Sequence, residues 1–109
     1  MEIAHHELFR RLALSDEHVL IQLMTGHTVD SPQLDEKTSA LGRLAGLAAM
    51  GADVTSFQWV VDAALAAGAE DEDVIGALLA VAPIVGLARV AAAAQSLAPA
   101  LGYQLEGDP

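Results

Sequence analysis

The side chains that could do chemistry in this sequence gather first around one tryptophan. Gln58 and Asp62 stand four residues apart, on either side of Trp59, within the stretch TSFQWVVDAALAAG. Side chains four apart are neighbours on a helix, so Gln58 and Asp62 could hydrogen-bond to each other beside the indole ring. Asp62 could then act as a general base, and Trp59 could stack on a planar ligand. The alternatives are structural: a capping glutamine, a structural aspartate and a tryptophan that anchors an interface.

Two isolated arginines form a second group of candidates. Arg43 and Arg89 each stand in a long stretch that contains no other charged side chain. Guanidinium groups on apolar helices could clamp the carboxylate of a substrate. They could equally pair with acidic side chains of other helices, namely Asp53, Asp62 and the acids at 70–73. The sequence leaves both alternatives open, and neither identifies a substrate.

The other reactive side chains support fewer kinds of site. All four histidines precede residue 34, and the adjacent His5 and His6 would point apart on a helix, which does not suit one shared metal ion. There is no His-Glu-x-x-His motif, glycine-rich phosphate loop or nucleophile elbow. Because the chain has no cysteine, disulfides, thiolate metal sites and thiol redox catalysis are excluded. We expect no metal and no cofactor.

The charge of the chain limits its partners. The formal net charge is −10, from 15 acidic and 5 basic residues, and this charge is repelled by phosphate backbones and anionic membranes. The two longest uncharged runs, at 74–88 and 90–105, each contain a proline and are shorter than the roughly 20 residues needed to span a bilayer. The first residues, MEIAHHELFRRL, do not resemble a signal peptide. We therefore expect a cytoplasmic protein that binds neither nucleic acid nor membranes.

The elements that must position these residues are helices. Alanine, the best helix former, supplies 22 of the 109 residues, and no segment alternates polar and apolar residues as a strand would. We expect an all-α fold of five or six helices with short connections. The sequence divides into an N-terminal helical arm at 1–33, a helical domain at 34–105 and a disordered tail at 106–109.

The helix that carries Trp59 has clear start and stop signals. Its core face is apolar at helical spacing: Phe57, Val60, Val61, Ala64 and Leu65. Thr55 and Gln58 fit a capping box at the start, and Gly68 fits a left-handed glycine at the end. Farther on, Pro83 lacks a backbone N–H, so it should kink or break the next helix, and the last helix should begin near Ile84.

The opposite face of the Trp59 helix is also apolar. It holds Trp59, Ala63 and Ala66, flanked by Gln58 and Asp62. A helix with two apolar faces needs cover on both, either from another layer of this chain or from a second subunit. Because 109 residues leave little chain for another layer, we favour a homo-oligomer.

Three motifs in the second part of the chain point to a known family. These are ALAAGA at 64–69, EDV at 72–74, and Pro83 followed by Gly86 and Ala88. Together with LDEKTSALGRLAGLAAM before them, their order and spacing resemble the carboxymuconolactone decarboxylase-like superfamily, which includes the alkylhydroperoxidase D-type proteins. The resemblance covers residues 34 to about 103. It implies an all-α fold with a packed helical hairpin, assembled as trimers or hexamers.

The resemblance does not bring the chemistry of the family with it. Redox members carry Cys-x-x-Cys-x-x-x-His near the start of this helix, and the matching positions here are Asp53, Ser56 and Val60. The chain therefore looks like a divergent member without thiol peroxidase activity. The lactone decarboxylase branch tends to have a histidine in this helix, and Val60 cannot transfer a proton. Gln58-Trp59 is similar to a subgroup in which the site was lost or rebuilt.

Two functions remain open. In the first, a carboxymuconolactone decarboxylase-like protein, and if an enzyme then a lyase, acts on or binds a small carboxylate or lactone between subunits. Its pocket would be near Gln58, Trp59 and Asp62, and Arg43 or Arg89 would bind the substrate. In the second, the chain is a non-catalytic oligomeric scaffold that has lost the active site. A pocket beside these residues favours the first, and arginines held by other groups with no cavity beside them favour the second.

Overall fold

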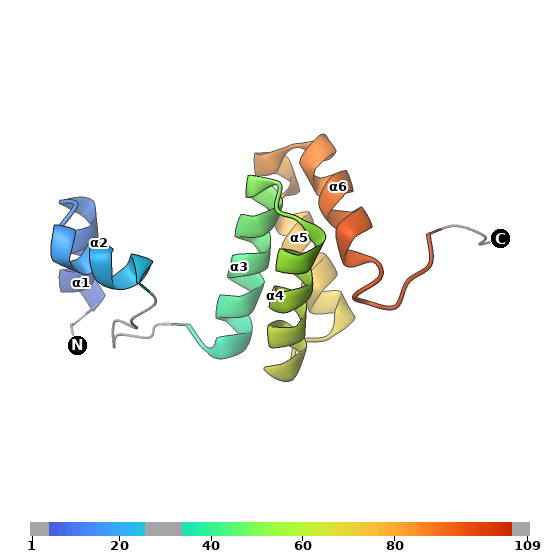
Figure 1. Ribbon diagram of the computed structural model, residues 1–109, viewed down its shortest axis with the longest axis horizontal. Helices are drawn as coiled ribbons and strands as arrows, with labels where there is room; N and C mark the ends of the chain where they lie inside the picture. Colours follow the sequence, from blue (N-terminus) through green and yellow to red (C-terminus); the bar gives the residue numbers. More distant parts are fainter. Residues whose placement is uncertain (1–4, 26–33, 106–109) are drawn as a thin grey trace. The chain divides into compact units, whose positions relative to one another are not determined.

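The computed structural model describes residues 5–25 and 34–105 and shows six helices and no strand in these ranges (Figure 1). The helices are α1 (His5–Ala13), α2 (Glu17–Met24), α3 (Glu36–Met50), α4 (Val54–Ala66), α5 (Asp71–Val85) and α6 (Leu87–Leu97). The expected all-α class is therefore confirmed for the described part of the chain. None of these helices has the length and apolar character needed to cross a membrane. The tail predicted at 106–109 lies outside the described residues.

The chain forms two compact units, Met1–Asp35 and Glu36–Pro109, which we describe separately. In the first unit α1 packs against α2. Asp16 caps α2, because its carboxylate accepts hydrogen bonds from the backbone N–H groups of His18 and Val19 at 3.0 and 3.3 Å. Val19 is the one buried apolar residue in the described part of this unit. Two short helices with so small a core bury little surface between them.

In the second unit the four helices run in alternating directions along the bundle (Figure 1). Helices α3 and α6 each pack against the other three, whereas α4 and α5 share at most marginal contact. The pair α3 and α6 thus forms the centre of the bundle, with α4 and α5 flanking it. This arrangement decides which surfaces remain open, because α4 and α5 each have one face against the central pair and no helix of this unit on the other.

The core of the second unit is thin. Its main cluster combines eight buried side chains from all four helices: Leu44, Ala48, Phe57, Val61, Val74, Leu78, Ala93 and Leu97. A second cluster of Ala40, Ala64 and Ala69 lets α3 approach the end of α4 closely. Phe57 is the one aromatic residue in either cluster. The core is therefore held by many small contacts around a single large side chain.

The start of α4 differs from the sequence prediction. The N-cap is Asp53, whose carboxylate accepts a hydrogen bond of 2.8 Å from the backbone N–H of Ser56. This bond favours the charged form and lowers the pKa of Asp53. The capping box predicted for Thr55 and Gln58 is thus wrong, because Thr55 already lies inside the helix that begins at Val54. An aspartate two residues before a threonine competes for the same orphan N–H groups, and here the aspartate satisfies them.

The end of α4 is as predicted. Gly68 has a φ of +99°, a left-handed conformation that only glycine adopts without strain. The N–H of Gly68 donates to the carbonyl of Leu65 at 3.0 Å, and the N–H of Ala69 donates to the carbonyl of Ala64 at 2.9 Å. This pair of bonds is a Schellman motif, and the contact between Ala69 and Ala64 in the small alanine cluster completes it.

Pro83 does not break the helix where it stands. Helix α5 continues through Pro83 to Val85, and α6 begins at Leu87 instead of near Ile84. The break falls at Gly86, which has a φ of +91°. Pro83 is the third residue from the end of α5, so its missing N–H removes one helical bond, to the carbonyl of Leu79, and the helix ends two residues later.

Two glycine substitutions with opposite expected effects test this account of the turns. Gly68→Ala should lower the free energy of unfolding by about 1 kcal/mol, because alanine at a positive φ is strained. Gly76→Ala, inside α5, should raise it by about 0.5–1 kcal/mol, because its Cβ would meet nothing within 4 Å and alanine favours the helix. Urea unfolding followed by circular dichroism measures both. A loss of stability in Gly76→Ala, or an unchanged stability in Gly68→Ala, would contradict this account of the helix and its turn.

Candidate functional site

The three candidate residues on α4 lie on an open surface. Gln58, Trp59 and Asp62 are exposed, and 76% of Trp59 is accessible to solvent. Core residues Phe57 and Val61 occupy the other side of the helix. Within the described ranges, Gln58 and Asp62 do not form the hydrogen bond that their spacing allows. The three side chains are thus neighbours on one helix face and form no enclosed pocket in this chain.

Arg89 has a structural partner. Its guanidinium donates a hydrogen bond to the backbone carbonyl of Ala49, in the last turn of α3. The neighbouring carbonyls of Leu47 and Ala48 accept from the backbone N–H groups of Ala52 and Gly51. Arg89 therefore satisfies a carbonyl that the helix end leaves unpaired, and it places a positive charge where the helix dipole favours one.

Arg43 is exposed on α3. Across residues 5–25 and 34–105, neither Arg43 nor Arg89 forms an ion pair, so the predicted pairing with acids of other helices is absent. The cation that does reach the acidic turn is Lys37, whose Nζ lies 3.3 Å from Oδ2 of Asp73. The use of either arginine in binding a ligand stays a prediction.

The acidic turn before α5 is organised by its own carboxylates. Asp73 accepts a hydrogen bond of 2.9 Å from the backbone N–H of Glu70. This bond, with a smaller contribution from Lys37, lowers the pKa of Asp73. Glu70, Asp71 and Glu72 stand around the N-terminus of α5, where the helix dipole favours negative charge. The cluster is accounted for as a helix start.

Tyr103 links the chain after α6 to this turn, a role that sequence reasoning did not assign to it. Its hydroxyl donates a hydrogen bond of 3.2 Å to Oδ2 of Asp71. The bond and the negative charge of Asp71 raise the pKa of Tyr103, so the phenol stays protonated and is a poor base at neutral pH. The available signal was its position: the chain's single tyrosine follows the end of the last helix.

The most apolar cavity of the second unit lies along α5 and α6, and we call it the α5–α6 groove. Its volume is about 290 Å³. Eleven residues line it: Val74, Ile75, Leu78 and Leu79 of α5, Val90, Ala94 and Leu97 of α6, and Ala98, Leu101, Tyr103 and Leu105 beyond α6. The hydroxyl of Tyr103 is the one polar side-chain group among them. Sequence reasoning missed this groove, because its members read as ordinary core positions of two amphipathic helices.

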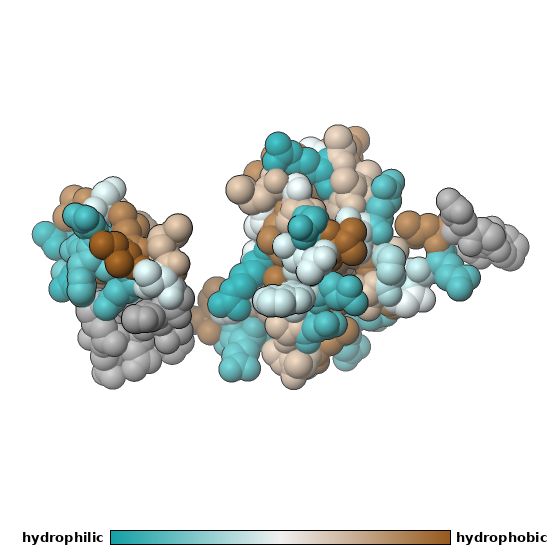
Figure 2. Space-filling model, viewed as in Figure 1, coloured by the Kyte–Doolittle hydropathy of each residue, from teal (hydrophilic) through white to brown (hydrophobic). Residues whose placement is uncertain are grey.

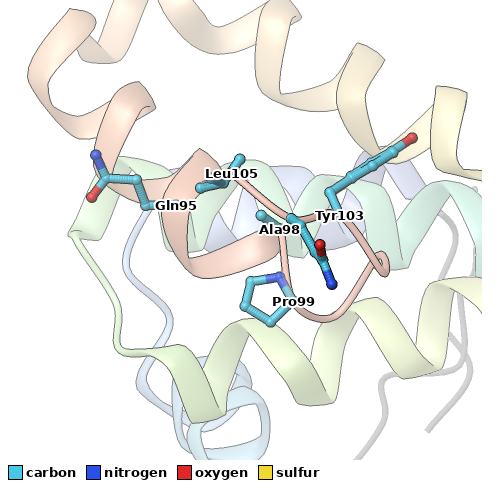
Figure 3. A pocket seen from close by; sticks show the side chains of 6 residues that line it. Gln95, Ala98, Pro99, Tyr103 and Leu105 are labelled. Carbon is cyan, nitrogen blue, oxygen red and sulfur yellow. The ribbon is translucent and has the colours of Figure 1, made fainter. Parts of the chain in front are cut away.

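A second hollow adjoins the groove at the turn that follows α6 (Figure 3). Tyr103, Ala98 and Leu105 line both cavities. In Figure 3 the ring of Tyr103 points away from Gln95 and Pro99, and its hydroxyl lies at the far end. Tyr103 is therefore part of the wall shared by the two spaces, and its hydroxyl bonds to Asp71.

These cavities offer binding surface and little reactive chemistry. None of the residues lining the α5–α6 groove or the adjoining hollow is a carboxylate, histidine, serine or lysine. No group of three or more histidine or acidic side chains in the described ranges could hold a metal ion. Gln58, Trp59, Asp62, Arg43 and Arg89 line neither cavity.

Comparison with known proteins adds no relative to this picture: no protein-family profile, no curated protein and no solved structure matches the chain. The fold and the surfaces define only a general class of protein. It is a small all-α protein whose second unit is a bundle of four helices with an open apolar groove. Any assignment of function must therefore rest on its own residues.

The single tyrosine allows a direct test of the contact between Tyr103 and Asp71. In the native protein the absorbance of tyrosinate should appear at a higher pH than the ordinary value near 10. The bond stabilises the folded state below that ordinary pKa, and the contribution is lost as the pH rises through the raised pKa. Asp71→Ala, which removes both the acceptor and the charge, should move the titration back towards the ordinary value. An unchanged titration in this variant would show that Asp71 does not hold the phenol.

Proposed function

We propose that this chain is a non-catalytic self-assembling helical protein, and that its second unit associates through the exposed face of α4. We call this surface the Trp59 face and define it by Trp59, Ala63 and Ala66. The observation that carries the proposal is the exposure of Trp59, which is 76% accessible on a helix whose other face is core. Tryptophan is among the residues most enriched at the energetic centres of interfaces. The two alanines would let a partner helix come close.

The balance of buried and exposed side chains supports the same conclusion. Among the described residues, seven large apolar side chains are buried, whereas 18 are exposed. Isolated exposed apolar residues are ordinary, but a chain with more than twice as many outside as inside has unusual surface to cover. Apolar residues lie among the polar ones on the face shown in Figure 2. Assembly would remove part of this surface from water and add to a thin core.

The resemblance to the carboxymuconolactone decarboxylase-like superfamily remains part of the proposal. We infer a divergent member assembled as a trimer or hexamer, without the cysteine pair of the redox members. It is supported by the all-α architecture and by the Gly68 turn, at the position of the ALAAGA motif. Binding of a small carboxylate or lactone near the Trp59 face has less support. The guanidinium of Arg89 already donates a hydrogen bond to the backbone carbonyl of Ala49. None of the five candidate residues lines the cavities described above.

Light scattering combined with size-exclusion chromatography tests the proposal. The purified protein should elute as a trimer, hexamer or similar assembly. Trp59→Ala should weaken this assembly by about 2 kcal/mol for each interface, roughly thirtyfold in the dissociation constant. The matched control is Met50→Ala, which removes another exposed apolar side chain, 80% accessible, from the end of α3. It should leave the assembly unchanged.

The chain's only tryptophan provides an independent measurement. If the Trp59 face is buried on assembly, its fluorescence should shift to longer wavelength on dilution, in parallel with the change in mass. A protein of 11.3 kDa at all concentrations, or an assembly that Trp59→Ala leaves intact, would overturn the proposal.

A further inference from the structure

The α5–α6 groove is an apolar cavity that assembly through the Trp59 face would not use. Its floor is fully buried: Val74 is 0% and Leu97 is 2% accessible. Its walls are open, with Leu79 and Leu105 both 63% accessible. Its volume of about 290 Å³ is near the lower end of the range of small-molecule sites, about 300–1,000 Å³. An apolar group that enters this space would displace water from side chains on both walls.

One end of the groove carries a negative charge. Asp71, Ile75 and Leu79 follow one another at four-residue spacing, so they share one face of α5. Ile75 and Leu79 line the groove, and Asp71 continues the same row by one turn. The hydroxyl of Tyr103, itself a lining residue, bonds to Asp71 and ties the carboxylate to the groove. Asp71 itself lines a separate hollow of about 400 Å³ with Leu65, Ala69, Glu70 and Glu72, so the hydroxyl of Tyr103 is the link between the groove and this acid.

No positive side chain of the described residues forms a salt bridge with Asp71. The salt bridges there join Glu7 to Arg10 and Arg11, and Asp73 to Lys37, so Asp71 has no ion pair within the described ranges. Glu70 and Glu72 flank Asp71 and add to the negative potential, and the whole chain has a formal net charge of −10. An anionic ligand would be repelled at this end, whereas a cation would be attracted.

We propose that the α5–α6 groove binds a small cationic amphiphile, with its apolar tail along Ile75 and Leu79 and its ammonium group at Asp71. The apolar lining accommodates a hydrocarbon tail, and Asp71 supplies the opposite charge. Tyr103 presents its ring to the tail and its hydroxyl to the head group. This ligand class differs from the small carboxylate expected from the sequence, because the groove lies beside acids instead of arginines.

Three eight-carbon probes that differ only in the head group test the charge assignment. Octylamine should bind in isothermal titration calorimetry, octanol should bind more weakly, and octanoate should bind most weakly of the three. Asp71→Asn, which keeps an oxygen acceptor for Tyr103, should weaken octylamine binding about tenfold and leave octanol binding unchanged. Equal affinity for octanoate and octylamine, or no effect of Asp71→Asn on octylamine, would overturn the assignment.

A matched pair of substitutions on α6 tests the location. Ala94 lines the groove and is exposed, so Ala94→Phe should fill the space and abolish binding of octylamine. Ala92 is exposed on the same helix and is not a lining residue, so Ala92→Phe should bind as the native protein does. Binding retained in Ala94→Phe, or no binding by the native protein, would overturn the proposal.

The same variants distinguish binding of a small ligand from coverage of the groove by a second copy of the chain. They also distinguish ligand binding from assembly through the Trp59 face. If no probe binds and Ala94→Phe changes the mass in light scattering, then a second copy of the chain covers the groove, and the proposal is wrong. Trp59→Ala should still bind octylamine whatever its state of assembly. Failure of the assembly proposal would therefore leave the ligand proposal standing, and the reverse also holds.

Discussion

The fold depends on the close packing of helices around a very small number of large side chains. Phe57 is the only aromatic residue in the core clusters of the second unit, and alanines fill many of the remaining core positions. Alanine brings two helices close together but removes little apolar area from water. Stability therefore depends on the accuracy of the helix ends, which fix how far each helix slides along its neighbours. The thin core also leaves large apolar side chains exposed, among them Trp59 on one proposed binding surface and Leu79 on the other.

The turns and caps fix where each helix begins and ends. Gly68 ends α4 with two backbone hydrogen bonds, and Asp53 begins the same helix. Gly86 reverses the chain between α5 and α6, so that these two helices run side by side and form the groove. The bond between Tyr103 and Asp71 then connects the segment after α6 to the start of α5, beside the groove.

Much of the fold could be predicted from the sequence because the signals were local. Apolar residues at helical spacing and the glycine at 68 gave the helices and the end of α4. The start of α4 was misassigned because Asp53 and Thr55 are both good caps, and spacing alone does not choose between them. The partners of Arg89 and Tyr103 could not be predicted. Each bond joins residues more than 30 positions apart, and one acceptor is a backbone carbonyl, which any residue supplies. The groove escaped notice for a related reason, because two helices form it together.

Arg89 shows that an isolated charged residue on an apolar helix can have a structural partner within the chain. Its bond to the carbonyl of Ala49 pins the first turn of α6 to the last turn of α3, so it fixes the register of these two central helices. Loss of the bond would leave the carbonyl of Ala49 without this donor. An isolated arginine on an apolar helix is therefore no sign of catalysis by itself.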